Sequence, residues 1–303
     1  MLVPLSIPSP GADSFDLTQW LAGLGLDFFG QWNLPIRFSV LCIAFGIVLA
    51  TWMTSHRLTR RGAEPGVVLD VIIWAIPLGF VGARVFFVLT HAGDYFGPRA
   101  DASAIFSLSL AGLSFVGALI GGAVGALIGC RLSGIRFWTF ADALAPALLV
   151  AQAVGRLGDY FDGVRFGVPT TLPWGLEVPS NNPAFPAGLA DGTLFQPLFL
   201  YNALWCLAGA GVLLLIERAF HLQWGRLWGV SLVWFGLGVG PWAGWALVVL
   251  GLVIVVVQAR RHPGLEPGPY RRGAEWVPPS AGVESSDPVP SATSEVGATS
   301  TPE

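Results

Sequence analysis

The chain has 303 residues, with 53% hydrophobic and 12% charged side chains and a formal net charge of −3. This composition and a mean hydropathy of +0.65 exclude an ordinary soluble enzyme, because soluble globular domains carry about twice this share of charge. The acidic balance gives no indication of nucleic-acid binding. We therefore expect an all-α protein, a polytopic helical bundle embedded in a membrane.

Residues 1–35 precede any long apolar run. They lack a basic start and carry Asp13 and Asp16, so they are not typical of a signal peptide. Residues 17–29 contain several leucine, tryptophan and phenylalanine side chains, which favours a short helix lying in the membrane interface. We expect the whole segment to be periplasmic or interfacial.

Apolar runs that approach the ~20 residues needed for a spanning helix follow in order. Five of them cover residues 36–54, 67–90, 104–129, 137–155 and 197–216. A last run, 227–257, is too long for one straight span, and glycine and proline interrupt it at 238–241. The bundle is therefore predicted to occupy residues 36–259 with seven spans, of which the sixth is short or re-entrant.

The positions of the arginines predict which side of the membrane each end of the bundle faces. With seven spans, eleven of the sixteen arginines fall on one side of the membrane, namely Arg57, Arg60, Arg61, Arg131, Arg136, Arg218, Arg226, Arg260, Arg261, Arg271 and Arg272. Positively charged loops remain in the cytoplasm. We therefore expect the N-terminus outside and the C-terminus inside.

Two polar stretches lie outside the spans. Residues 156–195 are rich in proline, glycine and asparagine on the predicted outer face, and loops of this length are usually functional or disordered. Residues 260–303 are rich in proline, serine, glycine and threonine and lack an apolar pattern. They are predicted to form a disordered cytoplasmic tail.

Small residues in the spans predict packing rather than chemistry. Glycine recurs every four residues in the third span, at positions 117, 121, 125 and 129, so a neighbouring helix can approach that face closely. The cysteines, Cys42, Cys130 and Cys206, are scattered in apolar surroundings. We expect neither a disulfide framework nor a metal site from them.

Charged residues at membrane depth need a partner. Asp70 and Asp142 stand near the starts of the second and fourth spans, where a helix cap or an interaction with the helix dipole would account for them. Arg84 lies well inside the second span. Its partner is predicted to be either a carboxylate or a lipid phosphate.

The densest polar cluster follows the fourth apolar run. Arg156, Asp159 and Asp162 are spaced three residues apart, so on a continuing helix they would share a face. An arginine flanked by glycines can bind a phosphate through two hydrogen bonds, and the carboxylates could accept from hydroxyls or act as a general base. The same residues could equally form a purely structural network of ion pairs at the end of the helix.

The segment 155–175 begins Gly-Arg-Leu-Gly-Asp-Tyr-Phe-Asp-Gly-Val-Arg-Phe-Gly and ends Leu-Pro-Trp-Gly. It resembles the signature of the bacterial prolipoprotein diacylglyceryl transferases. Segments around Arg37, Arg84, Ser114, Asp142 and Tyr201 resemble other motifs of that family in the same order.

The resemblance implies a seven-span bundle in the bacterial cytoplasmic membrane. It implies transfer of a diacylglyceryl group from phosphatidylglycerol to the lipobox cysteine of a preprolipoprotein, with no cofactor. The thiolate would be the nucleophile, and glycerol phosphate would leave. Arg156 matches the family's lipid-binding arginine, Arg84 its second-span arginine, and Gly158 and Gly167 two signature glycines. These four residues are therefore expected to bind phosphatidylglycerol.

Departures from the family pattern affect residues that would move protons. Histidine and glutamate positions are occupied here by Val116, Val164, Gln196 and Asn202, and the family's sixth-span arginine and glutamate have no counterpart within 234–245. Two signature asparagines are replaced by Asp159 and Asp162. We therefore hypothesise that Arg156, Asp159 and Asp162 are catalytic, with an aspartate replacing the lost base.

Two other interpretations stay open. The chain could be a catalytically silent relative that binds lipid or lipoprotein precursor as an accessory membrane protein. It could also be an unrelated transporter or scaffold, although the sequence shows no internal repeat of the kind that many transporters have.

Overall fold

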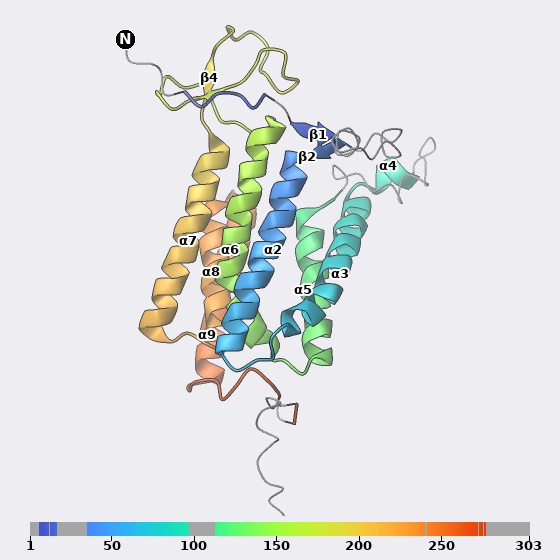
Figure 1. Cartoon of the computed structure of the whole chain (residues 1–303), viewed down its shortest axis with the longest axis vertical. Coiled ribbons are helices and arrows are strands. Elements are labelled where there is room, and N and C mark those ends of the chain that lie inside the picture. The colour runs from blue at the N-terminus through green and yellow to red at the C-terminus, as the bar shows by residue number, and fades with distance from the viewer. Residues whose placement is uncertain are drawn as a thin grey trace, which may run out of the picture.

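The computed structural model describes residues 6–11, 13–16, 35–96, 113–239, 241–271, 273, 274 and 276. Within these residues, seven long helices form one bundle (Figure 1). They are α2 (Phe38–Arg60), α3 (Val67–Thr90), α5 (Phe115–Leu132), α6 (Phe137–Asp162), α7 (Leu198–Phe220), α8 (Arg226–Gly238) and α9 (Pro241–Arg261). We call the end of the bundle with residues 163–197 the loop end and the end with residues 262–271 the tail end.

The predicted membrane bundle is confirmed, and the chain is a multi-pass membrane protein. Helices α2, α3, α6 and α7 and the Gly244–Arg261 part of α9 are long and apolar enough to span, and Val116–Leu132 of α5 is a shorter apolar helix. The predicted interruption at 238–241 separates α8 from α9. Because α8 has only 13 residues, it is about 20 Å long, which confirms a short sixth helix.

Two predictions concern residues that the structure does not describe. The interfacial helix expected at 17–29 and the first part of the third run, 104–112, lie outside the described residues. Which end of the bundle faces the cytoplasm stays a prediction.

Short strands at the loop end add to the predicted helical architecture. Two antiparallel pairs form there, β1 (Ser14–Asp16) with β2 (Pro35–Arg37) and β3 (Leu176–Glu177) with β4 (Leu194–Phe195). A short helix, α4 (Ala92–Phe96), follows α3 at the same end. Ile7 forms a parallel bridge to Leu176, and both pack near the fully buried Phe195. This small apolar core ties the N-terminal segment to the loop after α6.

The glycines of the third span pack α5 against α3. A Cβ atom at Gly129 would lie 2.7 Å from Cα of Val71, and one at Gly82 of α3 would lie 2.5 Å from the carbonyl oxygen of Gly117. Side chains cannot occupy such positions, so the two backbones touch directly. The predicted packing role of this glycine face is confirmed.

Paired charges join α2, α6 and α7 at the tail end. Glu217 of α7 accepts hydrogen bonds from Arg57 of α2 and from Arg61, which directly follows α2, each at 2.8 Å. Arg57 also donates through Nε to the carbonyl oxygen of Ala143 on α6, at 3.0 Å. One carboxylate and two guanidinium groups therefore fix three helices together.

Asp142 caps a different helix from the one that was expected. Its side chain is fully buried in α6 and accepts hydrogen bonds from the backbone N–H groups of Gly225, at 2.7 Å, and Trp228, at 2.9 Å. These groups belong to the start of α8, where unpaired N–H groups need an acceptor. Asp142 is thus an N-terminal cap for α8 rather than for α6.

The described part of the tail is packed, which corrects the prediction of disorder for residues 262–271. We call these residues the tail strap. Tyr270 is 8% exposed, and its hydroxyl accepts from the backbone N–H of Glu64 at 2.9 Å. The N–H of Arg271 donates to the carbonyl oxygen of Gly134 at 2.9 Å. One buried aromatic ring and its hydrogen bonds therefore anchor a segment whose composition is that of a loop.

Glu266 of the tail strap is buried against α6. Its carboxylate accepts from the hydroxyl of Thr139 and lies 3.8 Å from Nη1 of Arg136, and its side chain is 4% exposed. Burial raises the pKa of Glu266, while the hydrogen bond from Thr139 and the charge of Arg136 oppose that rise. The carboxyl group thus holds its proton more tightly than a free glutamate does.

Candidate functional site

The predicted polar cluster lies on the last turns of α6. The helix runs to Asp162, so the loop begins at Gly163 rather than at residue 156, a correction to the predicted boundary. Gly163 has φ of 63°, a left-handed conformation that glycine adopts readily and that ends helices. In the part of the helix beyond the apolar run, Arg156 and Asp159 pair across one turn.

Arg156 and Asp159 contact each other as the spacing predicts. Nη1 of Arg156 lies 3.3 Å from Oδ2 of Asp159, and Nη1 of Arg165 lies 3.8 Å from the other carboxylate oxygen. The side chain of Asp159 is 17% exposed, whereas that of Arg156 is 34% exposed. Asp159 is therefore held between two guanidinium groups, while Arg156 keeps N–H groups accessible to a further anion.

Asp162 is the last residue of α6 and is partly buried. It stands one turn beyond Asp159, so the two carboxylates lie at the same end of the helix. The structure thus places all three predicted catalytic residues within the last two turns.

Arg156 belongs to a face of α6 that points towards α7 and α8. Two turns below it, Leu149 packs in a buried cluster with Leu213 of α7 and Leu227 of α8. One turn below it, Oε1 of Gln152 lies 3.9 Å from Sγ of Cys206 on α7. Residues spaced by three or four share a helix face, so Arg156 points in the same direction at a higher level.

The two predicted lipid-binding glycines are positions of close packing. A Cβ atom at Gly158 would lie 2.9 Å from Cα of Ser39, so this glycine lets α6 approach α2. The N–H of Gly167 donates to the carbonyl oxygen of Gln196 at 2.9 Å. Both therefore set the position of the helix and loop around Arg156, and direct contact with lipid stays a prediction.

Arg84 lies on another helix pair. Its guanidinium carbon is 6.0 Å from the ring centre of Phe87 and 5.5 Å from that of Tyr95 on α4. Figure 1 shows α2 between α3 and α6. The structure therefore brings Arg156 together with Asp159, and it places Arg84 at the loop end of a separate helix.

The N-terminal segment lies beside the cluster, which the sequence did not predict. The hydroxyl of Tyr160 donates to the carbonyl oxygen of Pro8 at 2.8 Å, and the hydroxyl of Ser6 donates to Glu177 at 2.6 Å. Among the described residues, no group of His, Cys, Asp or Glu side chains could hold a metal ion.

Comparison with known proteins gives a consistent result. A model of the prolipoprotein diacylglyceryl transferase family matches residues 28–239 and so ends at the α8–α9 turn. A phosphatidylglycerol–prolipoprotein diacylglyceryl transferase of Leifsonia xyli is 52% identical, over 94% of this chain and 90% of the relative.

Two further relatives carry the same name. The protein of Paenarthrobacter aurescens is 43% identical, over 68% of this chain and 67% of the relative. The second such enzyme of Streptomyces coelicolor is 38% identical, over 77% of this chain and 79% of the relative. The chain therefore belongs to the prolipoprotein diacylglyceryl transferase family.

Proposed function

We propose that this chain transfers the diacylglyceryl group of phosphatidylglycerol to a prolipoprotein. Its family and the names of its relatives support this activity. In the structure, the observation that carries it is Arg156, whose side chain is 34% exposed on a spanning helix. Arg156 shares Asp159 with Arg165, so its charge can accept a further anion, and the phosphate of phosphatidylglycerol supplies one.

The reaction exchanges one bond for another. The sulfur of the acceptor cysteine, as thiolate, attacks the glyceryl carbon that carries the phosphate oxygen. A C–S bond forms, the C–O bond breaks, and glycerol phosphate leaves with the bonding electrons. Arg156 would stabilise the charge on the departing phosphate through charge-assisted hydrogen bonds.

The thiol proton needs an acceptor, for which Asp159 and Asp162 are the candidates. Asp159 already lies between the guanidinium groups of Arg156 and Arg165, an arrangement suited to orienting Arg156. This favours Asp162 as the proton acceptor. Gly158 and Gly167 would act by holding α6 and the loop in place, and Arg84 would bind lipid from the α3 side.

The site would work at the outer surface of the bacterial cytoplasmic membrane. The arginine-rich tail end would face the cytoplasm, and the loop end would face outward, where a lipobox segment could approach from the membrane. The protein would thus meet both substrates from the same side.

A reconstituted assay tests the proposal. Purified protein, labelled phosphatidylglycerol and a lipobox peptide should give a thioether product, and Arg156→Ala should abolish it. Arg165→Ala is the matched control, because this arginine contacts the same aspartate but is 67% exposed. Unchanged transfer by Arg156→Ala would contradict the assigned role, and unchanged transfer by the Asp159→Asn, Asp162→Asn double variant would exclude an aspartate base.

One specific observation favours a second candidate function. The family match ends at residue 239, and the family's sixth-span arginine and glutamate have no counterpart within residues 234–245. A catalytically silent relative would bind phosphatidylglycerol through Arg156 but form no thioether. Binding without product, under conditions in which an intact family member works, would establish that alternative.

A further inference from the structure

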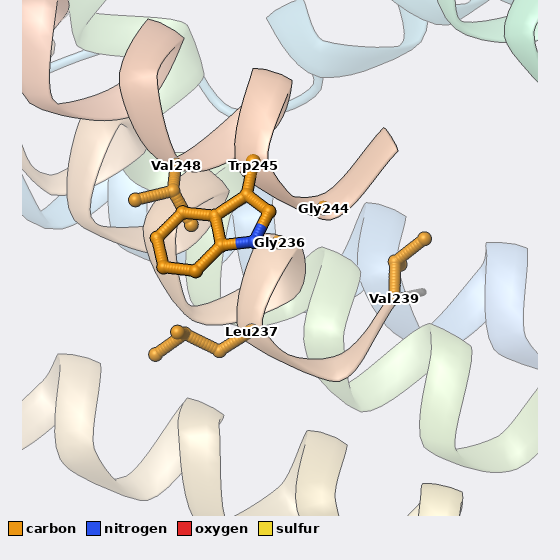
Figure 2. Close-up of a pocket in the computed structure, with 6 residues that line it drawn as sticks. All are labelled: Gly236, Leu237, Val239, Gly244, Trp245 and Val248. Atoms are coloured by element: carbon orange, nitrogen blue, oxygen red, sulfur yellow. The ribbon is translucent and has the colours of Figure 1, made fainter. Parts of the chain in front are cut away.

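The pocket at the α8–α9 turn has no group suited to proton transfer. It is shallow, with a volume of about 130 Å³ (Figure 2). Its lining residues are Gly236, Leu237, Val239, Gly244, Trp245 and Val248. Apart from the indole N–H of Trp245, these side chains offer no polar atom. Groups that could accept a proton lie instead at the end of α6, with Asp159 and Asp162.

Gly163 joins α6 to the loop that follows it. Its N–H donates to the carbonyl oxygen of Asp159 at 3.2 Å, which closes the last turn of the helix. Its own carbonyl oxygen accepts from Nδ2 of Asn182 at 2.9 Å, 19 residues further along the chain. Carbonyl groups at the end of a helix have no partner within the helix. Asn182 therefore supplies a donor at the residue that directly follows Asp162.

The side chain of Asn182 forms hydrogen bonds at both of its polar atoms. While Nδ2 donates to Gly163, Oδ1 accepts from the backbone N–H of Ala184 at 2.8 Å. The backbone N–H of Asn182 donates to the carbonyl oxygen of Pro179 at 3.0 Å. An amide offers a donor and an acceptor together, whereas an ionised aspartate offers acceptors only. We call residues 179–185 the Asn182 turn.

The Asn182 turn is anchored in the small apolar core at the loop end. The N–H of Phe185 donates to the carbonyl oxygen of Asn182 at 2.9 Å, and the ring of Phe185 meets that of Phe195 edge-on, with centres 5.6 Å apart. Phe195 is fully buried, and its ring centre lies 4.6 Å from that of Phe166. The core therefore sets the position of the turn, and the hydrogen bond from Asn182 transmits that position to Gly163.

Asp162 stands between a packed part of α6 and this hydrogen bond. The ring of Phe161 packs on that of Phe38 of α2, with centres 5.1 Å apart. Both chain neighbours of Asp162 are thus held, Phe161 by packing and Gly163 by the hydrogen bond from Asn182. Loss of the hydrogen bond would release the backbone on one side of Asp162, since helix ends fray readily.

We propose that Asn182 is a positioning residue for the transfer reaction. By fixing the carbonyl group of Gly163, its amide orients Asp162 so that the carboxylate accepts the thiol proton of the acceptor cysteine. The inference rests on the proposed function for the role of Asp162, and it adds a loop residue to those that serve the reaction. Because Arg156 is held separately through Asp159, loss of Asn182 should slow the chemical step and leave lipid binding unchanged.

Hydrogen exchange tests the contact without requiring catalysis. In the full chain with Asn182→Ala, the amides of residues 161–166 should exchange about five- to tenfold faster than in the parent, the effect of losing one hydrogen bond. The amides of residues 137–150 should exchange as before. Asn181→Ala is the matched control, because this neighbouring asparagine is exposed, and it should behave as the parent. Unchanged exchange at 161–166 in Asn182→Ala, or equal acceleration at 137–150, would overturn the proposal.

Kinetics test the role in the reaction. Asn182→Asp keeps an acceptor for Ala184 but has no donor for Gly163. It should lower kcat about tenfold and leave KM for phosphatidylglycerol within about twofold of the parent. Asn181→Asp adds the same charge at the neighbouring exposed position and should retain the parent kcat. Equal losses in the two variants, or a loss confined to KM, would overturn the positioning role.

A double-mutant cycle shows whether Asn182 acts through Asp162. Asp162→Glu keeps a carboxylate but displaces it by one CH₂ group, so it should already lose the alignment that Asn182 provides. Adding Asn182→Ala to Asp162→Glu should then lower kcat by less than about twofold, because residues that act through one group are not additive. A further tenfold loss would make Asn182 a merely structural residue, and parent-like kcat in Asp162→Glu would show that the carboxylate needs no exact position. Either result would overturn the proposal.

The two proposals fail in different ways. Unchanged kcat in Asn182→Asp, with normal transfer by the parent, would overturn the positioning role while the transferase assignment stands. Absence of a thioether product from the parent would overturn the proposed function, and the positioning role in that reaction would fall with it.

Discussion

The charged groups that join helices at the tail end have short contacts and are mostly buried, whereas Arg156 at the loop end has a longer contact and is more exposed. Glu217 accepts from two arginines at 2.8 Å, and Asp142 is fully buried with two N–H donors. At the loop end, Arg156 lies 3.3 Å from its aspartate and is 34% exposed. The difference indicates that the tail end supplies stability and the loop end keeps a cation available for a ligand.

Substitution of Arg156 should have the largest effect and should leave stability intact. We expect Arg156→Ala to lower kcat/KM for transfer about 10²–10³-fold, a loss typical of removing a group that stabilises transition-state charge. The thermal unfolding midpoint should stay near that of the parent. A loss of activity that is accompanied by an equal loss of folded protein would contradict the division between the two ends.

Substitution of Asp142 should mainly lower the stability of the protein. Asp142→Ala leaves buried N–H groups of α8 unpaired and should lower the free energy of unfolding by about 3 kcal/mol. Asp142→Asn keeps one acceptor and should cost about half as much. Denaturation in mild detergent would measure both. Similar unfolding curves for all three proteins would show that this cap does not stabilise the bundle.

The helix pair α3–α5 allows a matched glycine test. Gly129→Ala places a methyl group 2.7 Å from Cα of Val71 and should destabilise the protein by about 2 kcal/mol through overpacking. Gly122→Ala, where the nearest atom would be 3.8 Å away, should be neutral or stabilising by up to ~1 kcal/mol. Equal effects in thermal unfolding would contradict direct backbone contact.

Glu266 should give the smallest effect, a pH dependence at the tail end. Its pKa is raised above the ordinary 4.5, so the folded protein binds the proton more tightly than the unfolded chain does. Stability should therefore fall as pH rises from about 4.5 through the raised value, by at most ~1.4 kcal/mol per pH unit. Glu266→Gln should remove this part of the decline. An identical pH profile in the variant would exclude Glu266 as its source.

The lengths of the apolar runs made the helical bundle predictable from the sequence. The long-range polar contacts between its helices were not predictable. The run 67–90 became α3 without change, because a spanning helix satisfies its own backbone groups. The partner of Asp142 was not predictable, since it consists of backbone N–H groups 83 residues or more away. The tail strap was missed because one buried side chain, Tyr270, anchors a segment without apolar periodicity.

The candidate site shows the same limit. The pairing of Arg156 with Asp159 follows from helix spacing, and the structure contains it. Arg165 reaches the same carboxylate from a loop, and Pro8 accepts from Tyr160 across 152 residues. Contacts of this kind depend on how loops fold over helix ends, and the spacing of residues in the sequence does not predict that.

The bridge between Ile7 and Leu176 also constrains the order in which the protein assembles. Its two segments are separated by α2, α3, α5 and α6. During synthesis the N-terminal residues must wait until all four of these helices have been inserted before their strand partner exists. The contact of the N-terminal segment with the loop after α6 is therefore among the last parts to form, and an incompletely made chain would not yet have it.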